Sequence, residues 1–334
     1  MLREKRQKQA LRLTLPLVSS ANSWHNRFLS PSPLSSSSSN SNLDDFEKLA
    51  VLGRGNGGTV YKVRHRPTRA IYALKVLKFG EDTERVQQQA LREVEILKRV
   101  DSGFIVMCHG VFENGFADTD GGGEVCYFME YMEGGSLHNL LQKHHRLSED
   151  AISSIARSVL QGLNYLHTMQ IVHRDIKPSN LLINSKGETK IADFGVSGVV
   201  AGTAKELYGS CMGTCAYMSP ERIDPERWDG IYSDGCAGDV WSLGLVVMEC
   251  CIGHFPLINP GEKRDWVTLM CAISFEETRE MPETASAELR SFVRRCLHRN
   301  WRSRGTVKEL LRHPFVTKFQ NSAEKQLHYY VSCS

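Results

Sequence analysis

The stretch His173-Arg174-Asp175-Ile176-Lys177-Pro178-Ser179-Asn180, followed by Asp193-Phe194-Gly195, decides the fold. Its polar positions have the residue types and spacing of a phosphoryl-transfer site. Asp175 would accept the proton of a substrate hydroxyl, and Lys177 would lie against the transferred phosphoryl group. Asn180 and Asp193 would hold magnesium. The alternative is a polar loop between two helices, which would not require these residues at this spacing.

Length and composition are those of a globular enzyme. The chain has 334 residues, 41% of them hydrophobic and 24% charged, which is enough for one two-lobed domain with a tail. A net charge of only +3 does not favour nucleic acid as a partner. The longest apolar run, Leu245 to Ile252, is interrupted by Glu249 and is too short to span a bilayer. We therefore expect neither a nucleic acid nor a membrane as a partner.

The cysteines have no disulfide framework. Ten occur at irregular spacing, including Cys250-Cys251 in an apolar run and Cys211-x-x-x-Cys215 in a polar one. Scattered thiols in a chain of this size indicate a reducing compartment, which means the cytoplasm and also the nucleus. We expect most of them to be small buried hydrophobic residues.

Residues 1–45 differ in composition from the rest. Residues 19–42 are dominated by Ser, Asn and Pro, which predicts a disordered segment. Before them, basic residues precede leucines that alternate at period two, as in an extended peptide bound in a groove. The basic residues are Arg3, Lys5, Arg6 and Lys8, and the leucines are Leu11, Leu13, Leu15 and Leu17. A solvated tail and a transit peptide are the alternatives.

A glycine-rich run, Gly53-Arg54-Gly55-Asn56-Gly57-Gly58, follows an apolar stretch near the start of the globular part. This pattern alone also occurs in dinucleotide-binding folds, where it opens a helix. Here the next residues, Thr59 to Val63, favour a strand and carry no helix cap. A strand, glycine turn and strand would fold over the phosphates of a nucleotide, with backbone amides facing them.

Lys75 lies in Ile71 to Val76, which we expect to form a buried strand. A lysine on such a strand needs a partner. The helix expected over residues 84–100 has an apolar face of Val86, Ala90, Val94 and Leu97, with Glu93 beside it. A Lys75–Glu93 pair would aim the ammonium at the α- and β-phosphates. A solvent-reaching lysine and a solvated acid are the alternatives.

Val125 to Met132 predicts a strand followed by a linker, whose backbone N–H and C=O groups would contact an adenine ring. Met129 would close the back of that pocket. The residues that we expect to contact the nucleotide are Leu52, Gly53, Arg54, Gly55, Asn56, Gly57, Gly58, Thr59, Val60, Ala73, Lys75, Met129, Glu130 and Met132.

Helical patterns dominate the second part of the chain. Ser148 would cap a helix whose apolar residues, Ile152, Ile155, Val159, Leu163 and Leu166, recur with a 3.6 period. Asp239 to Ile252 predicts an apolar helix, and residues 266–272, 287–298 and 306–311 predict shorter ones. The expected fold is α+β and bilobal, with a small β-rich lobe of residues 46–132 and a larger helical lobe of residues 133–316.

Over residues 46–316 the chain resembles the eukaryotic protein kinases. Ser219-Pro220-Glu221, Asp239-x-Trp241-Ser242-x-Gly244 and Arg304 complete the match. The resemblance implies ATP and Mg2+ as cofactors, a buried Glu221–Arg304 ion pair, and Asp239 steadying the backbone of His173 and Arg174. Lys177 together with Thr214 implies a Ser/Thr-type catalytic site. Residues 317–334 would be a short C-terminal tail.

A narrower resemblance is to the MAP kinase kinases, especially those of plants. It rests on Gly134-Gly135-Ser136-Leu137, Gly195-Val196-Ser197 and Gly213 to Arg222. It implies dual-specificity phosphorylation of Thr and Tyr in a MAP kinase, and activation by an upstream MAP kinase kinase kinase. Residues 3–15 would then be the docking motif, with the basic cluster on an acidic patch and the leucines in an apolar groove.

The activation segment departs from that family's pattern. Arg174 beside Asp175 is a cation that usually pairs with a phosphate on this segment. The plant family has two acceptors five residues apart. Thr203 matches the first position, but the second falls on Gly209, with Ser210 one residue later. Thr203 and Ser210 are therefore the candidate phosphorylation sites, and activation by an upstream kinase stays open.

Three functions remain at this point. The first is an active dual-specificity MAP kinase kinase. The second is a kinase-like scaffold that docks a MAP kinase with little catalysis. The third is a Ser/Thr kinase of another pathway whose basic tail serves in targeting.

Overall fold

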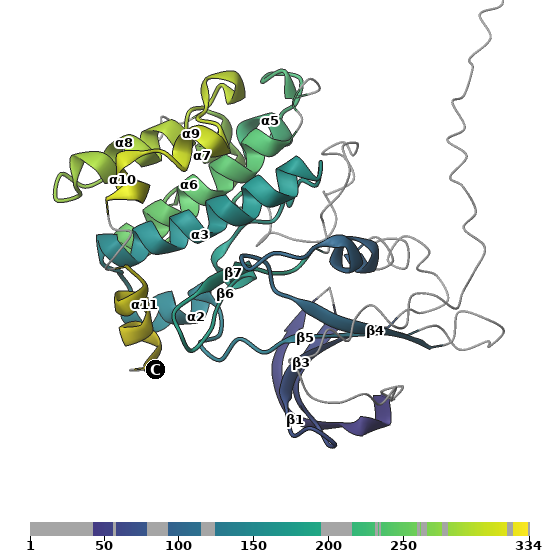
Figure 1. Ribbon diagram of the computed structural model, residues 1–334. Coiled ribbons are helices and arrows are strands. Elements are labelled where there is room, and N and C mark those ends of the chain that lie inside the picture. The colour runs from purple at the N-terminus through teal and green to yellow at the C-terminus, as the bar shows by residue number, and fades with distance from the viewer. Residues whose placement is uncertain are drawn as a thin grey trace, which may run out of the picture. The chain divides into compact units, whose positions relative to one another are not determined.

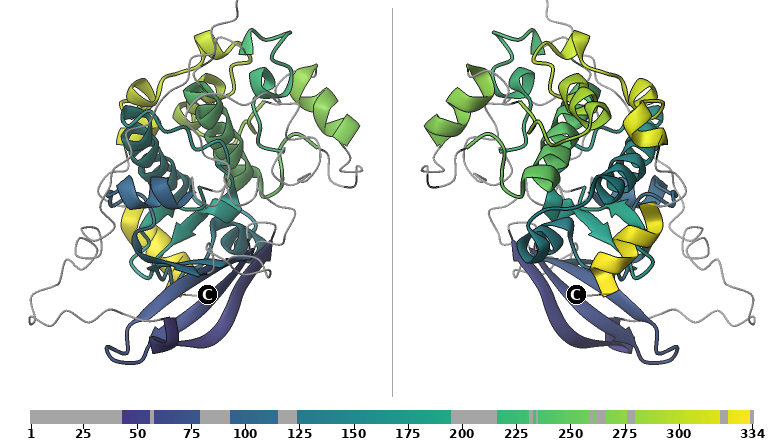
Figure 2. Two further views of the ribbon diagram at one scale, coloured as in Figure 1. Left: turned by 90° about the vertical axis from the view of Figure 1, so that its right-hand side faces the viewer. Right: turned by 90° about the vertical axis from the view of Figure 1, so that its left-hand side faces the viewer.

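The computed structural model describes residues 43–55, 58–78, 93–114, 124–194, 216–230, 233, 235–258, 261, 266–275, 280–318 and 323–332. All of them belong to one compact unit, Ser41–Ser334. The docking residues at 3–15, Asn56 and Gly57 of the glycine run, and Thr203, Ser210 and Thr214 of the activation segment lie outside the described residues. Within the described part, a sheet lies at one end of the unit and a group of helices at the other (Figures 1 and 2).

The sheet has five strands in the order β1-β2-β3-β5-β4, and the neighbouring strands are antiparallel. The strands are β1 (Phe46–Gly55), β2 (Gly58–His65), β3 (Ile71–Lys78), β4 (Cys108–Asn114) and β5 (Glu124–Glu130). A 3-10 helix, Leu43–Asp45, precedes them. The strand predicted after the glycine run is confirmed as β2, which excludes the helix of a dinucleotide fold. β4 has no counterpart among the sequence predictions.

The helical lobe is built on α3 (Glu149–Thr168) and α6 (Cys236–Ile252), which pack against each other. Ser148 caps α3 as predicted, and its hydroxyl accepts from the amide of Ala151. The apolar face predicted for α3 is buried throughout. The other helices are α2 (Leu137–His144), α5 (Pro220–Ile223), α7 (Trp266–Ser274), α8 (Ala287–Cys296), α9 (Val307–Leu310) and α10 (Pro314–Thr317). Two short strands, β6 (Leu181–Ile183) and β7 (Thr189–Ile191), form a separate antiparallel pair, and 3-10 turns occur at Pro178–Asn180 and Trp301–Ser303.

The sequence of residues 317–334 predicts only a short tail, yet Ala323–Ser332 forms helix α11. α11 packs against α3 and α2 (Figure 1). Leu327 is fully buried there, and the Tyr330 hydroxyl accepts from the amide of Ser148 at 3.2 Å. One buried leucine in a short polar segment is too weak a pattern to predict a helix, and packing on α3 supplies what the local sequence lacks.

The thiols follow the sequence expectation. All cysteines in the described part of the chain are free, and Cys108, Cys126, Cys250 and Cys296 are buried. Among the described residues, no helix is long and apolar enough to cross a bilayer.

Candidate functional site

Strand register brings several of the expected nucleotide residues of the small lobe, including Val60, Ala73 and Lys75, onto one face of the sheet. Ala73 pairs with Met129, and Lys75 pairs with Val60 on one side and with Tyr127 on the other. Gly53 of β1 pairs with the same Val60 of β2. Because side chains alternate along a strand, residues two apart on β3 and on β5 share a face. Residues from β1, β2, β3 and β5 therefore converge around Lys75.

Lys75 joins the two lobes through two carboxylates. Its Nζ lies 2.8 Å from Oε1 of Glu93 and 2.8 Å from Oδ1 of Asp193. Burial alone would lower the pKa of Lys75, but the Asp193 and Glu93 carboxylates outweigh it and raise that pKa. The lysine is therefore firmly charged. The predicted Lys75–Glu93 pair is present, and Glu93 begins the described helical residues 93–99, on which Val94 and Leu97 are buried as expected.

Asp193, the second carboxylate beside Lys75, is positioned by its neighbour Phe194. Asp193 has φ of 64°, in the left-handed region, and its side chain is 43% exposed beside Lys75. Phe194 is buried, and its ring meets the His173 ring edge-on at 5.2 Å between centroids. The buried Phe194 fixes the turn, so that Asp193 faces the lysine of the small lobe.

Asp175, Lys177 and Asn180 form a second group. Oδ2 of Asp175 lies 2.8 Å from Nζ of Lys177 and accepts from Nδ2 of Asn180 at 2.9 Å. Oδ1 of Asp175 is buried and has no hydrogen-bond partner among the described residues. Burial raises the pKa of Asp175, Lys177 opposes that rise, and Asp193 adds to it. An unpartnered buried carboxylate oxygen is rare and marks a position for an incoming donor.

Asp239 supports the backbone of this loop. Its Oδ2 accepts from the amide of His173 at 2.9 Å and its Oδ1 from the amide of Arg174 at 2.8 Å. His167 Nε2 lies 2.8 Å from Oδ2. Burial opposes the charge on His167, but hydrogen bonding to Asp239 and Cys236 outweighs it and raises the pKa of His167 to about 10. The predicted contact of Asp239 with residues 173–174 is confirmed.

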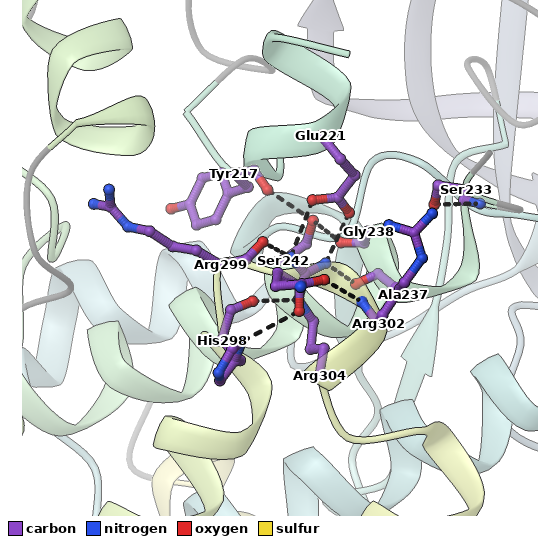
Figure 3. A network of polar contacts seen from close by, with 12 residues as sticks. Tyr217, Glu221, Ser233, Ala237, Gly238, Ser242, His298, Arg299, Arg302 and Arg304 are labelled. Atoms are coloured by element: carbon purple, nitrogen blue, oxygen red, sulfur yellow. Dashed lines mark hydrogen bonds and ion pairs between the residues drawn. The ribbon is translucent and has the colours of Figure 1, made fainter. Parts of the chain in front are cut away.

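The predicted Glu221–Arg304 pair is also present (Figure 3). Nη1 of Arg304 lies 2.8 Å from Oε1 of Glu221, and Nη2 lies 3.0 Å from Oε2. Arg304 also donates to the carbonyls of Ala237, His298 and Arg299. This bidentate pair joins the end of the activation segment to the late helices.

The glycine run has room for a bound group. A Cβ built at Gly53 or at Gly55 would meet no atom within 4 Å. Packing of the described residues therefore does not require glycine there, as expected where a ligand's phosphates approach the backbone. Gly58 differs, because its φ is +97° and a Cβ there would collide with the carbonyl of Val76.

The linker residues divide into two kinds. Met132 is buried with Val106 and Ala192. The carboxylate of Glu130 is bound elsewhere, because it pairs with Lys190 of β7 at 2.8 Å and accepts from the amide of Met107. Only the backbone of Glu130 is therefore left to bind a nucleotide.

The strand residues expected to contact the nucleotide differ in exposure. Leu52, Arg54 and Gly55 of β1 are exposed, Thr59 and Val60 of β2 are half-buried, and Ala73 of β3 is buried.

Two partners of the residues expected around the nucleotide were not among the sequence predictions. Lys190 pairs with Glu130, and the Tyr127 hydroxyl donates to Oε1 of Glu93. Tyr127 precedes Met129 by two positions, so alternation places both on one face of β5. A tyrosine in an otherwise apolar strand needs a polar partner, but the sequence does not name that partner.

Comparison with known proteins agrees with this geometry. The family profile described as "Protein kinase domain" matches residues 46–316. Mitogen-activated protein kinase kinase 10 of Arabidopsis thaliana is 50% identical over 320 residues, which are 95% of this chain and 98% of that protein. Mitogen-activated protein kinase kinase 9 of the same plant is 47% identical over 321 residues, with 95% and 98% covered. Mitogen-activated protein kinase kinase 7 is 45% identical over 312 residues, with 93% and 97% covered.

Proposed function

Since the chain belongs to the plant MAP kinase kinases of the protein kinase superfamily, we propose that it transfers the γ-phosphoryl group of ATP to Thr and Tyr in the activation loop of a MAP kinase. One observation carries the proposal. Oδ1 of Asp175 is buried without a partner among the described residues, in a site that also holds the Lys75, Glu93 and Asp193 charges. A substrate hydroxyl is the donor that this oxygen lacks.

ATP and magnesium fit the groups around this oxygen. Gly53 and Gly55 leave their backbone open to phosphates, and Lys75 supplies a charged donor. Nδ2 of Asn180 donates to Asp175, which leaves the amide oxygen as a candidate metal ligand with Asp193. Bound magnesium would neutralise phosphate charge and orient the transferred group.

The chain's own residues then have distinct tasks. Asp175 takes the proton of the acceptor hydroxyl, and Lys177, paired with it, places positive charge beside the transferred group. Lys75 orients the α- and β-phosphates, and Glu93 holds Lys75. Thr214 is expected to complete the acceptor side.

A catalytically inactive MAP kinase tests the proposal. With Mg-ATP, phosphate should appear on both Thr and Tyr of its activation loop, and Lys75→Met should abolish incorporation. Phosphoamino-acid analysis and mass spectrometry measure both. Binding without incorporation would indicate the scaffold, and activity on generic Ser/Thr peptides without binding would indicate a kinase of another pathway.

The N-terminal segment is proposed as the docking motif for that MAP kinase. Deleting residues 1–17 should raise the apparent KM for the MAP kinase roughly tenfold, because the basic cluster and the leucines add binding energy outside the active site. The KM for a short peptide should not change. Deletion of residues 19–35, of equal length and without that pattern, is the matched control, and equal KM values for both deletions exclude docking through residues 1–17.

Activation by an upstream kinase is a further part of the proposal, with Thr203 and Ser210 as acceptors. Arg174 supports it, because burial lowers the pKa of this arginine and its side chain has no ion pair within the described residues. Arg222 donates to the backbone carbonyl of Arg174 at 2.7 Å, and burial together with the nearby Arg174 charge lowers the pKa of Arg222, so the two cations lie near each other. A phosphate would pair with them. Mass-spectrometric mapping of residues 197–214 in active protein decides which acceptor is used.

A further inference from the structure

Tyr127 is a buried residue to which neither the nucleotide site nor the catalytic loop assigns a task. It lies on β5 directly opposite Lys75 of β3, and its side chain is fully buried. Its hydroxyl donates to Oε1 of Glu93, the same oxygen that accepts from Nζ of Lys75. The Lys75 Nζ also lies 5.4 Å from the centre of the Tyr127 ring. One tyrosine thus contacts both members of the ion pair.

Packing alone does not account for the hydroxyl. The ring fills the cluster that contains Leu97, Phe194 and Leu166, and a phenylalanine would fill it with the same ring. Burying a hydroxyl without a partner costs free energy, whereas donating to a charged carboxylate is among the stronger hydrogen bonds in proteins. The hydroxyl is therefore specific to its acceptor, Glu93.

The charges around Lys75 explain why Glu93 needs a second donor. A single ammonium serves two carboxylates, Glu93 and Asp193, at 2.8 Å each. Burial raises the pKa of Glu93, and Lys75 and the Tyr127 hydroxyl oppose that rise. Tyr127 is a neutral donor that stabilises the charged Glu93 without competing for Lys75. The apolar cluster around the Tyr127 ring also includes the buried thiol of Cys108 on β4, whose pKa is raised by burial.

We infer that Tyr127 is a positioning residue, whose hydroxyl holds Glu93 against Lys75 and so keeps residues 93–99 in the arrangement that orients ATP. This inference rests on the proposed phosphotransfer from ATP. The contact lies entirely between β5 and the described helical residues, so it acts within the fold of the small lobe.

Tyr127→Phe in the full chain removes only the hydroxyl. With Mg-ATP and myelin basic protein, kcat/KM for ATP should fall about tenfold, the effect of losing one hydrogen bond to a charged group. The KM for ATP should rise several-fold, whereas the KM for the protein substrate should stay within twofold. Tyr72→Phe is the matched control, because its ring packs on Phe46 and Phe128 of the same sheet and does not contact Glu93. It should leave all three constants unchanged.

A double-mutant cycle with Glu93→Gln tests whether Tyr127 acts through Glu93. In the Glu93→Gln background, adding Tyr127→Phe should change kcat/KM by less than about twofold, since coupled residues are non-additive. An equal loss in both backgrounds, or no loss in the single variant, overturns the inference.

Hydrogen exchange gives a readout that needs no activity. Amides of residues 93–99 should exchange faster in Tyr127→Phe than in the wild type or in Tyr72→Phe. If the wild-type protein proves inactive, the proposed function fails, but this comparison still tests Tyr127. Unchanged exchange at residues 93–99 overturns the positioning role.

Discussion

Asp175→Asn should lower phosphoryl transfer about 1000-fold, within the range of a lost general base. The amide keeps the shape of the carboxyl group but cannot accept a proton. Oδ1 of Asp175 is the buried oxygen that has no partner among the described residues, whereas Oδ2 is held by Lys177 and Asn180. The change therefore removes the acceptor of the proposed reaction and leaves its surroundings in place.

Stability should not fall with activity in this variant. Burial raises the pKa of Asp175, which means that the folded state disfavours its charge. A neutral amide should therefore leave the melting temperature unchanged or slightly higher. Initial rates and thermal unfolding measured on the same preparation separate the two effects, and near-wild-type rates would exclude Asp175 as the base.

Glu221→Gln should give the largest loss of stability, about 3–5 kcal/mol. The side chains of Glu221 and Arg304 are 1% and 0% exposed, and each oxygen of the carboxylate faces one nitrogen of the guanidinium. Removing the carboxylate leaves a buried cation with only neutral carbonyl acceptors. For a domain of this size the melting temperature should fall by roughly 10 °C.

Asp229→Asn is the matched control, because it makes the same acid-to-amide change in an exposed pair. Asp229 lies 3.0 Å from Arg302, with side chains 61% and 47% exposed. Such pairs contribute at most about 1 kcal/mol. Equal shifts for Glu221→Gln and Asp229→Asn would contradict the buried-pair argument, and Glu221→Leu with Arg304→Met should cost less than Glu221→Gln alone.

Local patterns predicted much of this fold. The 3.6 period of Ile152, Ile155 and Val159 is a local pattern, so it predicts a helix without reference to the rest of the fold. Ser148 precedes that pattern, and α3 begins directly after it, as the cap predicts. β4 and α11 were not predicted. Their residues depend on neighbours that are distant in sequence, as Leu327 depends on α3, and no local period reveals such a partner.

For the candidate site too, some features follow from the sequence and others only from the tertiary structure. By itself, the sequence named the residues that are proposed to carry the chemistry, because Lys75, Asp175, Asn180 and Asp193 belong to motifs whose residue types the proposed reaction requires. Only the tertiary structure decided how they are held. Tyr127 meets Glu93, Lys190 meets Glu130, and one oxygen of Asp175 is left without a described partner. The physical reason is that a buried hydroxyl or charge takes its partner from whichever chain segment the fold packs against it, and nothing in the local sequence specifies that segment.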